Sequence, residues 1–156
     1  MSVSDKVEVE LMDIAYSAPE RATEFSVGYD IYSAEDQCIR PLDRKLIRTG
    51  FKLHLPVGVE AQIRTRSGLA NKHGVFVLNS PGTIDPDYRG EVKILLFNSG
   101  PTPFDIERGD RIAQMVFAYY LAPVISEDTA VSYTRGEGGF GSTGINDIKL
   151  DKVNDI

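Results

Sequence analysis

Short runs in which apolar and polar residues alternate recur along this chain, with turn-forming residues between them. Residues 7–11 and 59–64 alternate strictly, and residues 46–55 repeat the pattern until Pro56 ends it. Such alternation places one face of a strand against a core and the other in solvent. Residues 111–120 form the longest predicted strand. Many short strands at nearly even spacing predict an all-β protein, either a distorted β-barrel or a double-sheet jelly roll.

One stretch, residues 66–74, departs from this pattern and predicts the single short helix. Ser67 suits the N-cap position, the next residues favour a helix, and Gly74 ends it. Arg66, Ser67 and Gly68 also place a cation, a hydroxyl and a bare backbone where helix N–H groups attract phosphate. These residues are therefore either a phosphate site or an ordinary helix cap.

Length and charge exclude several classes of protein. The 156 residues fit one domain with its own core, and a formal net charge of −6 argues against a nucleic-acid-binding surface. No apolar run reaches the roughly 18 residues of a membrane span. The charged N-terminus resembles neither a signal nor a transit peptide. We therefore expect a protein that is not secreted and is cytoplasmic, or nuclear if its source is eukaryotic or viral.

Cysteine chemistry is not expected to carry the function. The single cysteine, Cys38, excludes an internal disulfide and indicates a reducing compartment. A nucleophile pair with His54 or His73 is formally possible, but neither histidine lies in a turn-rich, glycine-rich stretch. Cys38 is therefore interpreted as a residue without a chemical role.

Residues 79–91 contain two turn signals around one carboxylate and one aromatic side chain. Pro followed by Gly at 81–82 suits a type II turn, so residues 75–78 and 83–84 are predicted to form a hairpin. Asp85 then begins a second turn, which leads into a strand over residues 91–97. A carboxylate fixed between two stiff turns suits a preorganised site. The alternative is that Asp85 simply starts a turn.

A glycine-rich segment at residues 135–144 differs from everything before it. It has little apolar surface, so we expect a core over residues 1–134 and a flexible arm over 135–156. Its backbone N–H groups could surround phosphate, although it is not a Walker A loop. It could equally be a linker, but Phe140 favours a lid that stacks on a planar base.

Two polar residues in predicted strands are further candidates. Asp30 could face solvent or a magnesium ion through water. Gln114 shares a strand face with Ile112 and Val116, so its amide needs a partner, either backbone or a ligand phosphate. Arg-Gly-Asp at 108–110 is interpreted as a tight hairpin turn and not as an adhesion motif.

Five segments in this order resemble the motifs of the trimeric dUTPases, the deoxyuridine triphosphate nucleotidohydrolases. They are residues 28–34, 66–70, 82–90, 109–114 and 135–144. The resemblance implies a β jelly roll assembled as a homotrimer, with three active sites at subunit interfaces. It also implies magnesium-assisted hydrolysis of dUTP to dUMP and pyrophosphate, which keeps uracil out of DNA and supplies dUMP for thymidylate synthesis.

The resemblance also implies a role for each matching residue. Asp85 would activate the water that attacks the α-phosphorus and meet the sugar 3'-hydroxyl, and Tyr88 would lie against the deoxyribose. Asp30 would lie in the outer shell of Mg²⁺, bound through water. The remaining residues would bind substrate: Asn79, Gly82, Thr83 and Ile84 at uracil, Arg66, Ser67, Gly68 and Gln114 at the phosphates, Lys93 as a further substrate contact, and Arg135, Phe140, Gly141, Ser142 and Thr143 from the arm of a third subunit.

Two positions next to these motifs depart from the family pattern, and two other functions stay open. Thr65 stands where many relatives have proline, and Val27 where alanine is common. A dCTP deaminase of the same fold would carry a glutamate on the strand after Asp85, where residues 94–96 are apolar. A catalytically silent trimer that binds nucleotide to regulate a partner would bind dUTP without turnover.

Overall fold

The computed structural model describes residues 6–127. The chain divides into two compact units, Met1–Ala122 and Pro123–Ile156, and all helices and strands of the described residues lie in the first. The predicted boundary between residues 134 and 135, and the arm that follows it, lie outside the described residues. Among the residues described, no helix is long and apolar enough to cross a membrane.

Twelve strands and one helix make up this first unit, so the prediction of an all-β fold with one short helix is confirmed. In chain order they are β1 (Glu8–Leu11), β2 (Glu20–Arg21), β3 (Tyr29–Tyr32), β4 (Gln37–Ile39), β5 (Arg44–Arg48), β6 (Phe51–His54), β7 (Val59–Arg64), α1 (Ser67–His73), β8 (Val75–Val77), β9 (Gly82–Ile84), β10 (Lys93–Asn98), β11 (Phe104–Ile106) and β12 (Arg111–Tyr119).

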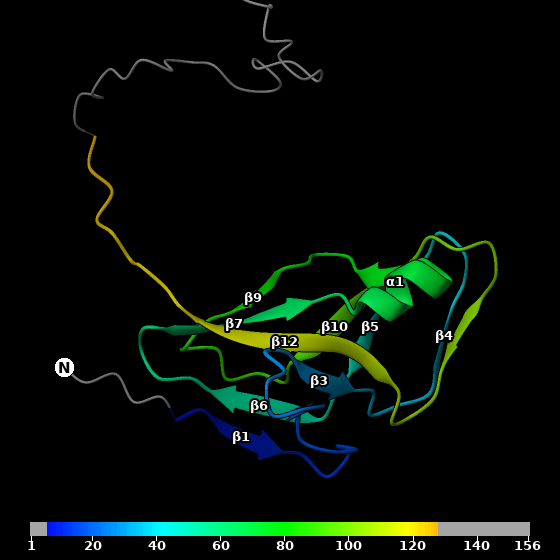
Figure 1. The fold of residues 1–156 in the computed structure, drawn as a ribbon, viewed down its shortest axis with the longest axis horizontal. Helices are drawn as coiled ribbons and strands as arrows, with labels where there is room; N and C mark the ends of the chain where they lie inside the picture. The colour runs from blue at the N-terminus through cyan, green and yellow to red at the C-terminus, as the bar shows by residue number, and fades with distance from the viewer. Residues whose placement is uncertain (1–5, 128–156) are drawn as a thin grey trace, which may run out of the picture. The chain divides into compact units, whose positions relative to one another are not determined.

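The strands form four small antiparallel sheets, an open and distorted jelly roll (Figure 1). The largest has the order β2-β3-β12-β7-β9, with the long strand β12 in its middle. A second has the order β5-β10-β8, and β1-β6 and β11-β4 form two-stranded ribbons. Strands β3, β12 and β7 thus form the middle of the largest sheet, and β9 is one of its edge strands.

The core is built from the inward residues of the alternating strands. On β7, Val59, Ala61 and Ile63 are buried while the residues between them reach the surface. Strand β12 breaks its alternation at Ile112 and Ala113, which are both buried because the pairing with β3 shifts register there. Each fully buried aliphatic side chain contributes about 1.5–3 kcal/mol to folding before entropy is subtracted.

Helix α1 ends as its sequence predicts but begins differently. Gly74 adopts a left-handed conformation with φ of 66°, and its N–H donates to the Ala70 carbonyl 3.1 Å away. Arg66, however, is the N-cap residue, in extended conformation and without a side-chain capping bond. The prediction of Ser67 as the cap was therefore wrong: Ser67 is the first helical residue, and it is exposed.

The predicted hairpin over residues 75–84 was also wrong. Strand β8 pairs with β10, whereas β9 pairs with β7 in another sheet, so the two consecutive strands diverge. Pairing with Ile63 draws Gly82 into a strand, and Gly82 lacks the positive φ that a type II turn requires. The peptide bond between Ser80 and Pro81 is cis.

The tight turn predicted at residues 108–110 is confirmed, but the prediction that it joins the two strands of a hairpin was wrong. Gly109 has a φ of 98°, and the Asp110 N–H donates to the Glu107 carbonyl 3.0 Å away. The strands on its two sides pair elsewhere, β11 with β4 and β12 with β3, so this turn carries the chain from one sheet to the next.

Candidate functional site

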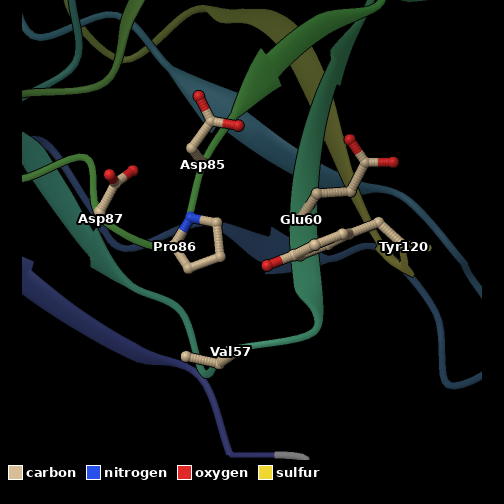
Figure 2. A pocket seen from close by; sticks show the side chains of 6 residues that line it. All are labelled: Val57, Glu60, Asp85, Pro86, Asp87 and Tyr120. Atoms are coloured by element: carbon tan, nitrogen blue, oxygen red, sulfur yellow. The ribbon is translucent and has the colours of Figure 1, made fainter. Parts of the chain in front are cut away.

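Asp85 directly follows the edge strand β9 and is exposed to solvent. Ile84 pairs with Ala61 of β7, which places Asp85 beside Glu60 at the same end of the sheet. A hollow of about 650 Å³ lies here, which we call the Asp85 hollow (Figure 2). Figure 2 shows the Tyr120 hydroxyl end pointing toward Pro86, below the Asp85 carboxylate. The hollow is lined by Val57, Glu60, Asp85, Pro86, Asp87 and Tyr120.

A second hollow, of about 360 Å³, also has Asp85 in its wall. We call it the Tyr88 hollow, and Thr83, Ile84, Tyr88 and Lys93 of the predicted set meet in it. Tyr88 is 43% exposed there, so one side of its ring is free to lie against a bound molecule. Asp85 therefore stands where two hollows meet. The remaining lining residues are Leu46, Glu91 and Val92.

The start of β9, at Gly82, is closely packed against the Asn79 side chain. Gly82 is buried, and a Cβ atom on it would lie 3.1 Å from the Asn79 amide nitrogen and 3.5 Å from Ile63. Glycine thus lets the exposed Asn79 side chain lie against the β9 backbone. The structure brings these two residues together at the start of β9, whose other end leads to Asp85, although not within the predicted hairpin.

The turn that carries Tyr88 is fixed at both ends. The Tyr88 N–H donates to the Asp85 carbonyl at 3.1 Å, which confirms the second predicted turn. The Tyr88 hydroxyl donates to the Glu91 carbonyl at 2.9 Å. A Cβ atom on Gly90 would overlap that hydroxyl, so the ring requires glycine at this position.

A third hollow, of about 450 Å³, joins the first, second and fourth sequence motifs. We call it the arginine hollow. Gln114 lies in it and donates its side-chain amide to the Thr65 carbonyl 2.9 Å away, so its partner in this chain is backbone. The lining residues are Ala22, Ser26, Val27, Gly28, Asp30, Arg66, Ser67, Gly68, Arg111 and Gln114.

Asp30 holds two arginines in the arginine hollow. One carboxylate oxygen accepts from Arg66 Nε at 3.0 Å and the other from Arg111 Nη1 at 3.2 Å, and only 14% of the Asp30 side chain is exposed. Arg66 also donates to the Arg111 carbonyl at 3.0 Å. The result is a pair of preorganised cations, which suits a polyanion. Tyr32 pairs with Arg111 between β3 and β12, and a hydrogen bond to Glu20, followed by burial, raises the pKa of Tyr32 to about 12.

A directly bound metal has no obvious place in the described part of the chain. No group of three or more His, Cys, Asp and Glu residues lies close enough there to hold an ion. Asp30 is the acidic residue of the arginine hollow, and both of its carboxylate oxygens already accept from arginines.

The Asp85 side and the arginine hollow lie at opposite ends of β7. Asp85 stands beside Glu60, whereas Gln114 pairs with Arg64 and Arg66 follows it. Arg66 lies six positions after Glu60, which is about 20 Å of extended chain. One chain therefore does not bring all the predicted residues to one point. Arg135, Phe140, Gly141, Ser142 and Thr143 lie outside the described residues.

Sequence reasoning missed several residues that line these hollows. Arg111 stands at a strand start that gives no sign of its pairing with Asp30. Glu60 is one of several outward polar residues on β7, and Leu46 and Tyr120 resemble ordinary strand residues. Glu91 carries the clearest signal, because an acid begins a segment that is apolar through residue 97 except at Lys93.

Known proteins similar to this chain agree on one family. The family model described as dUTPase matches residues 15–144. A deoxyuridine 5'-triphosphate nucleotidohydrolase of Zymomonas mobilis is 49% identical over 145 residues, which are 90% of this chain and 99% of that protein.

Solved structures agree with this result. A mutant dUTPase of Staphylococcus bacteriophage 80alpha with dUpNHpp has a TM-score of 0.83 at 27% identity, over 91% of this chain and 100% of that one. A mutant dUTPase from phage phi11 of S. aureus, described with a structural Mg(II) ion, has a TM-score of 0.76 at 23% identity, over 83% of this chain and 100% of that one. The second likeness concerns the fold alone.

Proposed function

Because the chain belongs to the dUTPase family, we propose that it hydrolyses dUTP to dUMP and pyrophosphate by attack of water on the α-phosphorus. The observation that carries this proposal is the position of Asp85, an exposed carboxylate between the Asp85 hollow and the Tyr88 hollow. A nucleoside bound in the Tyr88 hollow would leave its α-phosphate near the Asp85 carboxylate. Water could reach this phosphate from the Asp85 hollow.

Asp85 acts as the general base in this proposal. Its carboxylate takes a proton from the water as the oxygen attacks phosphorus, and pyrophosphate leaves. A positioned base of this kind contributes roughly 10² to 10⁴ in rate. The turn from Asp85 to Tyr88 keeps the carboxylate in place, so little reorganisation is needed before attack.

The edge of β9 is suited to reading a base. β9 is the last strand of its sheet, so residues 82–84 pair with β7 on one side and offer main-chain donors and acceptors on the other. Uracil and cytosine present opposite donors and acceptors on the edge that differs between them. Unpaired polar groups in a closed site discriminate by about 10⁴-fold. The adjacent Asn79 amide would add a side-chain contact.

Tyr88 selects the sugar in this proposal. The Tyr88 ring, which lines the Tyr88 hollow, would lie against the deoxyribose and leave no room for a 2'-hydroxyl. Lys93 lines the same hollow and would add a cation near the nucleotide.

The phosphates would be held in the arginine hollow of a second copy of the chain. Arg66, Ser67, Gly68 and Gln114 gather there, but Arg66 lies about 20 Å of extended chain beyond Glu60, the residue beside Asp85 in the same chain. Consecutive phosphates are joined by single oxygen atoms, so one triphosphate cannot bridge that distance. A homotrimer with sites between subunits resolves this, with Arg135, Phe140, Gly141, Ser142 and Thr143 supplied by the arm of a third subunit.

Magnesium is part of the proposed reaction. Bound to the triphosphate, Mg²⁺ would supply charge neutralisation for the departing pyrophosphate. Asp30 would orient the two arginines and meet the water around the ion. The arginines would neutralise the remaining charge on the phosphates.

A pyrophosphate-release assay with dUTP, dTTP, dCTP and UTP tests the proposed function. We expect turnover of dUTP and at least about 10²-fold lower kcat/KM for the other three nucleotides. Ammonia release from dCTP would instead support a deaminase. Binding of dUTP without any turnover would support a regulatory nucleotide-binding trimer, and either result would overturn the proposal.

A further inference from the structure

The carboxylate of Glu91 is buried and fully used within the protein. Its side chain is 8% exposed and accepts from Arg48 Nε at 3.1 Å, from the Thr49 N–H at 3.2 Å and from the Gly50 N–H at 3.0 Å. A charge this buried needs such partners, and removing it leaves donors unsatisfied. Glu91 therefore joins the start of β10 to the turn between β5 and β6.

The same segment determines where Tyr88 lies. The Tyr88 hydroxyl donates to the Glu91 carbonyl at 2.9 Å, and its ring packs against Gly90. The next residue continues the connection, because the Val92 N–H donates to the Phe51 carbonyl at 2.9 Å and Thr49 donates its hydroxyl to the Val92 carbonyl. The exposed Tyr88 ring is therefore held by its contacts with Gly90 and Glu91.

We propose that Glu91 is a positioning residue that acts through Tyr88 to exclude ribonucleotides from the site. This inference rests on the proposed function. The buried carboxylate fixes the position of the Glu91 carbonyl, and that carbonyl holds the Tyr88 hydroxyl. The position of the Tyr88 ring then determines how much space is left beside the sugar. Steric exclusion of one hydroxyl depends on the placement of this wall, and a displacement of about 1 Å can cost on the order of 10²-fold.

The test compares Glu91→Gln with wild type for kcat/KM on dUTP and on UTP. The glutamine oxygen can still accept from the Thr49 and Gly50 N–H groups, but its NH2 group then faces Arg48 Nε, and two donors in contact force the segment to shift. We expect the dUTP-to-UTP preference to fall about 10-fold or more, mainly through KM. Arg48→Met removes one of the three donors and should produce a smaller fall, which provides a second variant if Glu91→Gln does not fold.

Glu35→Gln is the matched control. Glu35 accepts from the Arg48 N–H at 2.9 Å and so stabilises the same strand. Within the part of the chain that the structure describes, it makes no hydrogen bond to Tyr88 or Glu91. This variant should lose stability and keep the dUTP-to-UTP preference. In a Tyr88→Phe background the link to the carbonyl is absent, so Glu91→Gln should change the preference less than it does in wild type.

The outcomes separate this inference from the proposed function. If wild type did not hydrolyse dUTP, the proposed function would fail, and the affinities for dUpNHpp and for its ribonucleotide counterpart would still test Glu91. If wild type hydrolysed dUTP but Glu91→Gln kept the same preference as Glu35→Gln, Glu91 would be a stabilising residue only. The positioning role would then be rejected.

Discussion

Replacing Gly28 with alanine should disturb the arginine hollow through one identifiable contact. A Cβ atom at position 28 would lie 2.5 Å from the side-chain oxygen of Gln114, which is closer than Cβ atoms approach nonbonded neighbours, so something must shift. Gln114 can turn away, but its amide would then lose the 2.9 Å bond to the Thr65 carbonyl. Such a bond contributes about 1 kcal/mol net, so we expect the free energy of unfolding to fall by about that amount.

The expected consequences are measurable in two ways. A loss of about 1 kcal/mol lowers Tm by roughly 2–4 °C for a chain of this size. The same energy lost in phosphate binding would raise KM for dUTP about fivefold. Thermal unfolding and steady-state kinetics of Gly28→Ala check both values.

Gly68→Ala is the control for this prediction. A Cβ atom there meets nothing within 4 Å, and alanine favours a helix more than glycine does, so this variant should keep or raise Tm. If Gly28→Ala matched wild type in both Tm and KM, Gln114 would not be fixed between Gly28 and Thr65. The account of the arginine hollow would then be wrong.

Three further predictions concern other parts of the chain. Because the folded pKa of Tyr32, about 12, lies above its ordinary value of 10.0, Tyr32 contributes stability that is complete below about pH 10 and lost as pH rises toward 12. Tyr32→Phe should remove that slope in urea unfolding between these pH values; an unchanged slope would contradict the Glu20 contact. Truncation after Thr134 should abolish most hydrolysis and leave the proposed trimer intact in light scattering, and a monomer would refute the core boundary. Phe140→Ala should slow turnover, since its ring is expected to stack on the base, and normal kinetics would remove that role.

The strands themselves are predictable from sequence because their signal is local. The alternation on β7 follows from burial of every second residue, and Gly74 ends α1 because its backbone alone tolerates the left-handed conformation at little cost. Strand partners are not local in this way. The consecutive strands β8 and β9 pair with β10 and β7, and no feature of residues 75–84 specifies those partners.

The site shows the same division. Asp85 and Tyr88 are predictable because turn chemistry and motif order mark them within a few residues. Arg111 is not, because its pairing with Asp30 depends on the register between β3 and β12. Glu91 is not, because its three donors lie more than 40 positions earlier in the chain. Contacts that depend on register and on sheet assembly require coordinates.

The measurement that tests the central claim most directly is the turnover of Asp85→Asn. Asparagine keeps the shape of the side chain but cannot accept the proton from water. The account predicts that affinity for dUpNHpp stays close to that of wild type while kcat for dUTP falls by roughly 10² to 10⁴. An Asp85→Asn variant that hydrolysed dUTP at the wild-type rate would contradict the assignment of Asp85 as the base.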